Sequence, residues 1–138
     1  MKAAENLWFA IERAVENMPA RKHRYGIGAR LNNQAFEVWT LTNRAWRDTR
    51  QQRHLVEKLR WKVDDLKLCL TMAKRLEAFR GKREFFPLAI QAEGLGAQVG
   101  GWLKKFSPIA QNAQAGNGHA QRGQKLSARD ASNAGAKS

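Results

Sequence analysis

The stretch from about residue 53 to residue 79 carries two apolar stripes on opposite sides of one predicted helix. At about 100° per residue, the first stripe groups six side chains within roughly 80° of one another: Leu55, Leu59, Val63, Leu66, Leu70 and Ala73. The second stripe is centred about 180° away and consists of Trp61, Leu68, Met72 and Phe79. A helix in a small monomeric bundle needs only one apolar stripe. The second stripe therefore predicts contact with a further subunit or another protein, and the alternative is that loops or the C-terminal segment of the chain fold over it.

Three further stretches repeat apolar residues at helical spacing. Their expected inward faces are Leu7, Ile11, Ala14, Val15 and Met18 within 3–18, then Leu31, Ala35, Val38, Thr42 and Ala45 within 29–46, and Leu88, Leu95, Val99, Trp102, Leu103 and Phe106 within 84–106. Ala89, Gly96 and Gly100 form an adjacent strip of small residues that would let a neighbouring helix approach closely. Pro19 ends the first stretch, and Pro87 is tolerable in the first turn of the last. No strand-like alternation appears, and the short connections favour an all-α, antiparallel up-down-up-down four-helix bundle.

Composition changes abruptly after Phe106. Residues 107–138 contain no aromatic residue, and their only large aliphatic residues are Ile109 and Leu126. Such a segment buries too little apolar surface to offset the entropy of ordering it. We therefore expect two parts: the bundle in residues 1–106 and a disordered, weakly basic tail in residues 107–138.

The charge is strongly positive, with 25 Lys and Arg residues against 12 Asp and Glu residues, a formal net charge of +13. Such an excess causes self-repulsion that a polyanionic partner relieves. Nucleic acid is the leading candidate. An anionic membrane is a weaker one, and a charge that serves solubility alone is the remaining alternative.

The candidate nucleic-acid-binding residues are basic positions that the predicted core does not require. They are Arg21, Lys22 and Arg24 in the first connection, Arg44, Arg47, Arg50 and Arg53 at intervals of three residues, and Arg60, Lys67, Lys74 and Arg75 beside the second stripe. Arginine predominates, which suits forked contacts with phosphate oxygens. No helix-turn-helix pattern or aromatic RNA-stacking motif accompanies them. Contacts to the nucleic-acid backbone, tolerant of sequence and sensitive to salt, are therefore expected.

No pattern typical of a catalytic or metal site is present. The histidines His23, His54 and His119 are scattered, and Asp64 and Asp65 are adjacent on a helix, so they point about 100° apart. The single cysteine, Cys69, lies among leucines and is expected to be a small buried hydrophobic residue. We therefore expect a protein that is not an enzyme and that has no cofactor and no metal.

The chain also lacks the features expected of a membrane or secreted protein. Its first residues, MKAAENLWFAIER, place two glutamates inside the apolar part, unlike a signal peptide. No apolar run approaches the ~18 residues of a membrane span. We expect a soluble cytoplasmic protein without a membrane partner.

Three segments, in order and with matching spacing, resemble one family. They are PARKHRYGIGAR from Pro19 to Arg30, VEKLRWKVDDLKLCLTMAKRL from Val56 to Leu76, and LGAQVGGWLKK from Leu95 to Lys105. Together they are similar to the connection, the long third helix and the close of accessory variability determinant (Avd) proteins, which are four-helix bundles of diversity-generating retroelements. The resemblance covers about residues 5–105.

This resemblance implies a homo-oligomer, a pentameric barrel in that family, with a positively charged surface that binds the reverse transcriptase of the retroelement. With that enzyme the family supports error-prone copying of a template RNA into cDNA. Lys67 stands at the first of two basic positions of the third helix, whereas Thr71 stands where a second arginine is common. Related bundles encoded within ribosomal RNA insertions share this connection. They supply an alternative function, which is nucleic-acid binding without a polymerase partner. A third possible function is that of a purely structural bundle that binds other proteins and whose charge serves solubility.

Overall fold

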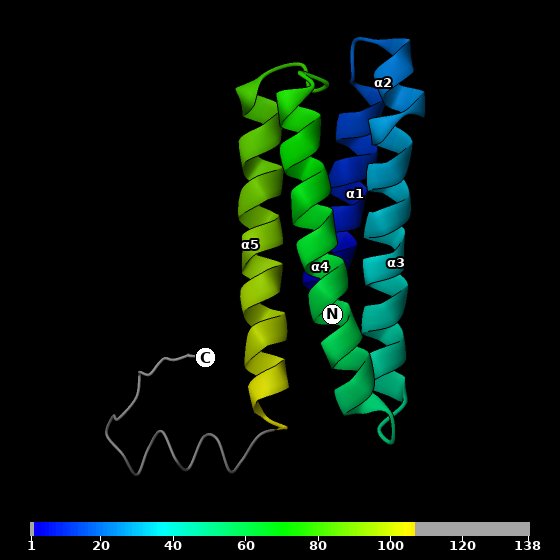
Figure 1. Cartoon of the computed structure of the whole chain (residues 1–138), viewed down its shortest axis with the longest axis vertical. Helices are drawn as coiled ribbons and strands as arrows, with labels where there is room; N and C mark the ends of the chain where they lie inside the picture. Colours follow the sequence, from blue (N-terminus) through cyan, green and yellow to red (C-terminus); the bar gives the residue numbers. More distant parts are fainter. Residues whose placement is uncertain (1, 107–138) are drawn as a thin grey trace, which may run out of the picture. The chain divides into compact units, whose positions relative to one another are not determined.

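The computed structural model describes residues 2–106, and the part of the chain up to Leu103 forms one compact unit (Figure 1). Its helices are α1 (Lys2–Glu16), α2 (Arg21–Tyr25), α3 (Ile27–Arg47), α4 (Gln52–Arg75) and α5 (Lys82–Lys104). The four long helices alternate in direction, and no strand occurs within the described range. The predicted all-α, up-down-up-down four-helix bundle is thus confirmed. The predicted tail, residues 107–138, lies outside the described residues.

The apolar periodicity identified the core correctly. Every predicted inward residue of α1, α3 and α4 is buried, and so are Leu88, Leu95 and Val99 of α5. Trp102, Leu103 and Phe106, which were also predicted to face inward, are only half-buried. The Trp102 ring lies 5.0 Å from that of Trp46, so α5 meets the end of α3 there. Cys69 is buried, as expected for a small hydrophobic residue.

The connection between α1 and α3 contains the short helix α2, which hydrophobic periodicity did not predict because five residues are too few to show a period. Arg24 Nη1 donates a hydrogen bond of 2.7 Å to the Met18 carbonyl oxygen, which ties α2 to the end of α1. Glycine is required at position 28, at the start of α3, because neighbouring atoms leave no room for a Cβ there. A Cβ added there would lie 2.7 Å from Val15 Cγ1 and 2.9 Å from the His23 carbonyl oxygen.

Helix α4 ends four residues earlier than predicted, at Arg75, because Glu77 adopts a left-handed conformation with φ of 57°. The amide of Glu77 donates to the Lys74 carbonyl at 2.9 Å, and the amide of Ala78 donates to the Ala73 carbonyl at 2.9 Å. This pair of bonds is the Schellman motif, which terminates helices and usually has glycine at the left-handed position. The chain therefore leaves the helical register before Phe79.

The small-residue strip of α5 does not bring a neighbouring helix close within the described bundle. The backbones of α1 and α3, and of α3 and α4, approach within 8 Å along their length, whereas α5 stays further from its neighbours. The Lys67 side chain of α4 lies over Gly96, with its Nζ 3.1 Å from the place of an added Cβ. A Cβ at Gly100 would meet nothing within 4 Å. The expected close approach at this strip is therefore not found, because a lysine side chain fills the space at Gly96.

Candidate nucleic-acid interface

A groove of about 690 Å³ lies at the C-terminal end of α3 and the start of the connection to α4. It brings together three of the predicted basic residues, Arg44, Arg47 and Arg50. Its other lining residues are Trp39, Thr40, Asn43, Asp48 and Thr49. We call these eight residues the arginine groove. Because Arg44 and Arg47 are three residues apart on one helix, their side chains project from the same face.

Helix packing and local hydrogen bonds hold the walls of the arginine groove. The Trp39 ring lies 5.1 Å from that of Trp8 on α1 and 5.9 Å from that of Phe36. Asn43 Nδ2 donates to the Trp39 carbonyl oxygen at 2.9 Å. Asp48 Oδ1 accepts a bond of 3.1 Å from the Gln51 amide, which orders the connection after α3. The only acid of the groove is thus engaged with backbone.

The arginines of the groove have no acidic partner. All salt bridges of residues 2–106 use lysines: Lys2 with Glu5, Lys62 with Glu37, and Lys67 with Asp64 and Glu93. Asp48 is in the groove but makes no salt bridge there. Three guanidinium groups therefore share one exposed surface with a single carboxylate and without a salt bridge. Such an arrangement can bind an anion whose charges repeat along a chain, since each fork can take two phosphate oxygens.

The remaining predicted basic residues do not join this surface. Arg21, Lys22 and Arg24 of α2 lie at the opposite end of the bundle, close to the end of α4 that carries Lys74 and Arg75 (Figure 1). Arg53 is exposed at the start of α4, and Arg60 is exposed further along that helix. At about 1.5 Å per residue, the 24 residues of α4 separate its two ends by about 36 Å. The predicted set thus lies at both ends of the bundle and, with Arg60 and Lys67, along α4 between them.

Four of the predicted binding residues are already engaged within the protein, among them Arg21, whose guanidinium carbon lies 5.4 Å from the centroid of the Tyr25 ring. Arg24 caps carbonyls at the end of α1, as described above. Lys67 Nζ lies 3.8 Å from an Asp64 oxygen and 3.6 Å from a Glu93 oxygen. Lys74 Nζ lies over two aromatic rings, 5.0 Å from the centroid of Phe85 and 5.5 Å from that of Phe86. These cations contribute to the local potential but are less free to reorient than the groove arginines.

The second apolar stripe of α4 is exposed along the helix, with Trp61 67% and Leu68 70% accessible and Met72 also exposed. Leu76, which the sequence pattern did not include, extends it. Phe79 was wrongly assigned to this stripe. It lies beyond the helix, is 8% accessible, and packs with its ring 6.0 Å from that of Phe85. The reason is the turn at Glu77, which redirects the chain inward. We call Trp61, Leu68, Met72 and Leu76 the exposed stripe.

Sequence reasoning missed the groove residues Trp39, Thr40 and Asn43. A signal was present, because Trp39, Asn43 and Arg47 are spaced four residues apart and therefore share a helix face. It also missed an aromatic cluster between α1 and α3, in which Trp8 lies 5.5 Å from Phe9 and 5.3 Å from Phe36. Sequence spacing could not reveal this cluster, because the cluster depends on α1 packing against α3.

Comparisons with known proteins returned no matching family model, curated protein or solved structure. Among residues 2–106, no group of three or more His, Cys, Asp or Glu side chains is arranged to hold a metal ion. None of the described helices has the length and apolar character needed to cross a membrane.

Proposed function

We propose that this protein is a non-catalytic adaptor that binds nucleic acid through the arginine groove. The carrying observation is the set of three guanidinium groups, Arg44, Arg47 and Arg50, gathered beside Trp39 without an acidic partner. Contacts of this kind engage the phosphate backbone, release counterions and weaken steeply as salt rises. They are compatible with RNA and with an RNA–DNA hybrid, because they do not read the bases.

Within this proposal, the protein is an accessory component of a diversity-generating retroelement. It binds the reverse transcriptase and holds the template RNA or the RNA–cDNA hybrid near it, which supports mutagenic retrohoming. The support for the polymerase partner is the resemblance of three segments to the Avd family. The exposed stripe adds a surface for protein contact, since exposed contiguous apolar side chains usually mark association sites.

We further propose that the exposed stripe mediates assembly into a homo-oligomer, a pentamer as the resemblance implies. The test is sedimentation velocity of Leu68→Glu beside Ile90→Glu. Both residues are 70% accessible, but Ile90 lies on α5, outside the stripe. Assembly through the stripe predicts that Leu68→Glu sediments as a monomer while Ile90→Glu keeps the wild-type oligomer. A wild-type protein that is monomeric at micromolar concentration contradicts the assignment.

The second candidate is a nucleic-acid-binding bundle of the ribosomal-insertion type, which has no polymerase partner. The arginine groove itself favours it, because backbone contacts need no other protein. A tagged pull-down from the native host, with bound protein and RNA identified together, separates the two. Recovery of a reverse transcriptase with RNA supports the adaptor, RNA alone supports the second candidate, and the absence of both contradicts nucleic-acid binding.

A further inference from the structure

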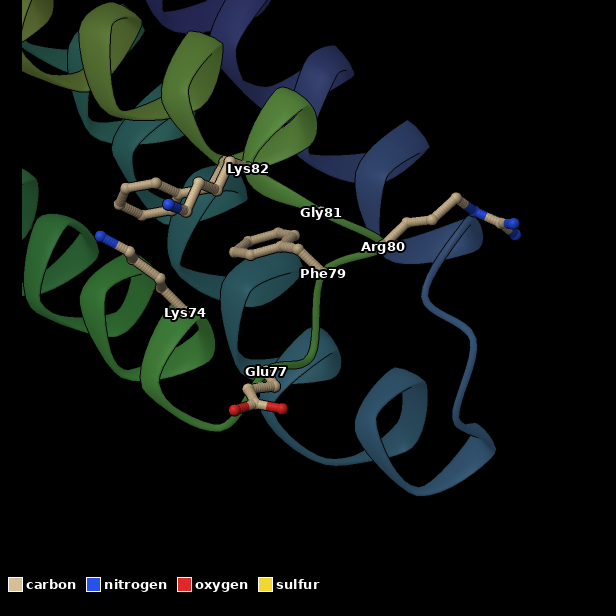
Figure 2. Close-up of a pocket in the computed structure, with 7 residues that line it drawn as sticks. Lys74, Glu77, Phe79, Arg80, Gly81 and Lys82 are labelled. Atoms are coloured by element: carbon tan, nitrogen blue, oxygen red, sulfur yellow. The ribbon is translucent and has the colours of Figure 1, made fainter.

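A second hollow, of about 470 Å³, lies where α4 turns into α5, at the end of the bundle opposite the arginine groove (Figure 2). We call it the turn cavity. Its lining residues are Lys74, Lys82, Glu77, Phe79, Phe85, Gly81 and Arg80, and the Arg80 side chain extends away from the cavity. It therefore combines positive charge with two aromatic rings, whereas the arginine groove contains a single aromatic residue, Trp39.

The aromatic rings at the turn cavity form a continuous surface. The rings of Phe79 and Phe85 lie 6.0 Å apart, and Phe85 contacts Phe86 edge-on at 5.5 Å. Phe79 and Phe85 are almost fully buried, whereas Phe86 does not line the cavity and is exposed beside it, next to Phe85. The ammonium group of Lys74 lies over both Phe85 and Phe86. A cation is thus held against an aromatic surface that is open to solvent on one side.

The charged groups around the turn cavity form no salt bridge within the described residues. Neither Lys74 nor Lys82 forms a salt bridge, and Glu77 pairs with no cation there. Figure 2 shows Lys74, Lys82 and Phe79 on one side of the turn, whereas the Arg80 side chain extends away from them. The two lysine side chains therefore face the cavity. The Arg80 side chain starts from the same turn but points away from the cavity.

The turn itself is held in place by backbone bonds. The Schellman bonds of Glu77 and Ala78 fix the end of α4, and the Glu84 amide donates to the Gly81 carbonyl at 3.1 Å where α5 begins. Ala78 is fully buried between them. The backbone that carries the aromatic rings and the lysines is therefore ordered before any ligand arrives, which lowers the entropic penalty of binding.

We propose that the turn cavity binds the phosphate of an unpaired nucleotide of a single strand, between Lys74 and Lys82, while the base lies against the exposed ring of Phe86 beside the cavity. Base stacking on aromatic side chains needs a base that is free of a duplex. Lysine ammonium groups suit a phosphate as point charges. This inference rests on the proposed nucleic-acid binding and adds to it a preference for single strands, which the arginine groove alone does not supply.

The test compares binding of a labelled oligo(U) strand of about 10 nucleotides and of an RNA duplex of the same length, by fluorescence anisotropy at one salt concentration. The variants are Lys74→Gln and Phe86→Leu, with Arg80→Gln as the matched control for charge. We expect Lys74→Gln to weaken single-strand binding about fivefold and Phe86→Leu about threefold. Duplex binding should change less than about twofold. Arg80→Gln should weaken both ligands by the same small factor.

If Lys74→Gln and Arg80→Gln weaken both ligands equally, only long-range charge acts at this end and the inference is overturned, while nucleic-acid binding stands. A separate titration with uridine 5′-monophosphate, followed through backbone amide shifts in NMR spectra, tests the cavity if the protein binds neither the single strand nor the duplex. Shifts confined to residues 74–86 in a protein that binds neither RNA support the cavity and contradict the proposed function. A protein that binds neither RNA and shows no such shifts contradicts both.

Discussion

Lys67 on α4 reaches Glu93 on α5, with 3.6 Å between the ammonium nitrogen and a carboxylate oxygen, and its side chain crosses Gly96 on the way. A lysine that sequence spacing assigned to nucleic-acid binding thus joins two helices of the bundle. Its ammonium is also 3.8 Å from Asp64. The ammonium group is therefore paired with two carboxylates of the protein, whereas the sequence pattern predicted that it would bind a phosphate.

We predict that Lys67→Gln weakens RNA binding less than Arg47→Gln, because a paired ammonium attracts phosphate less than an unpaired guanidinium. The loss of its partly exposed ion pairs should lower the free energy of unfolding by no more than about 1 kcal/mol. Parallel anisotropy titrations and urea denaturation of the two variants measure these effects. An equal or larger loss of affinity in Lys67→Gln would show that Lys67 leaves Glu93 and contacts RNA directly.

Glu77→Gly should stabilise the protein. Glu77 has φ of 57°, a conformation that disfavours residues with a Cβ by roughly 1 kcal/mol relative to glycine. Because the Schellman bonds of this turn involve only backbone atoms, glycine keeps them. The free energy of unfolding should rise by about 1 kcal/mol in urea denaturation. Glu77→Ala is the control for loss of the carboxylate, and a gain as large as that of glycine would refute the backbone explanation.

Two glycines in helices should respond in opposite directions to alanine. At Gly28 an added Cβ would lie 2.7 Å from Val15 Cγ1 and 2.9 Å from a carbonyl oxygen, so Gly28→Ala must push α1 and α3 apart. We expect a loss of about 1–3 kcal/mol in the free energy of unfolding. At Gly94 the Cβ meets nothing within 4 Å, and the helix propensity of alanine should add up to about 1 kcal/mol. Thermal and urea unfolding of both variants provide the comparison, which fails if the two changes share a sign.

Burial raises the pKa of the Cys69 thiol above its ordinary value of 9.0, and the nearby positive charge of Arg30 opposes this shift more weakly. Above pH 9.0 the unfolded chain loses the thiol proton while the folded chain retains it, so the unfolded state binds fewer protons. This contribution to stability is therefore present below that pH and is lost as pH rises further. Urea unfolding across this range should show a steeper decline for the wild type than for Cys69→Ala. Parallel declines would contradict it.

The four long helices were predictable because their apolar residues recur with the helical period, and packing follows that period from Leu7 to Val99. The end of α4 could not be predicted, because it depends on a left-handed backbone conformation at Glu77. Glutamate, unlike glycine, does not indicate such a conformation in a sequence. Phe79 was misplaced for the same reason. The five-residue α2 was too short to show a period.

The candidate interface was predictable only in part. The regular spacing of Arg44, Arg47, Arg50 and Arg53 indicated a basic surface, and the arginine groove contains the first three but not Arg53. The engagement of Lys67 with Glu93 and of Lys74 with Phe85 depends on contacts between helices, which local spacing does not reveal. Topology likewise decides that α2 and the end of α4 lie at the same end of the bundle, away from the groove (Figure 1).

The most direct test of the account is the salt dependence of RNA binding by the wild type and by a variant with Arg44, Arg47 and Arg50 all changed to Gln. A charge-matched control carries the same change at Arg13, Arg30 and Lys58, which are exposed and lie outside the arginine groove. We predict that the logarithm of the wild-type affinity falls linearly with the logarithm of salt concentration. The groove variant should lower the slope by about 2 for a single strand, and the control should leave it nearly unchanged. A wild-type affinity that barely changes with salt, or an equal slope in both variants, would contradict binding through the groove.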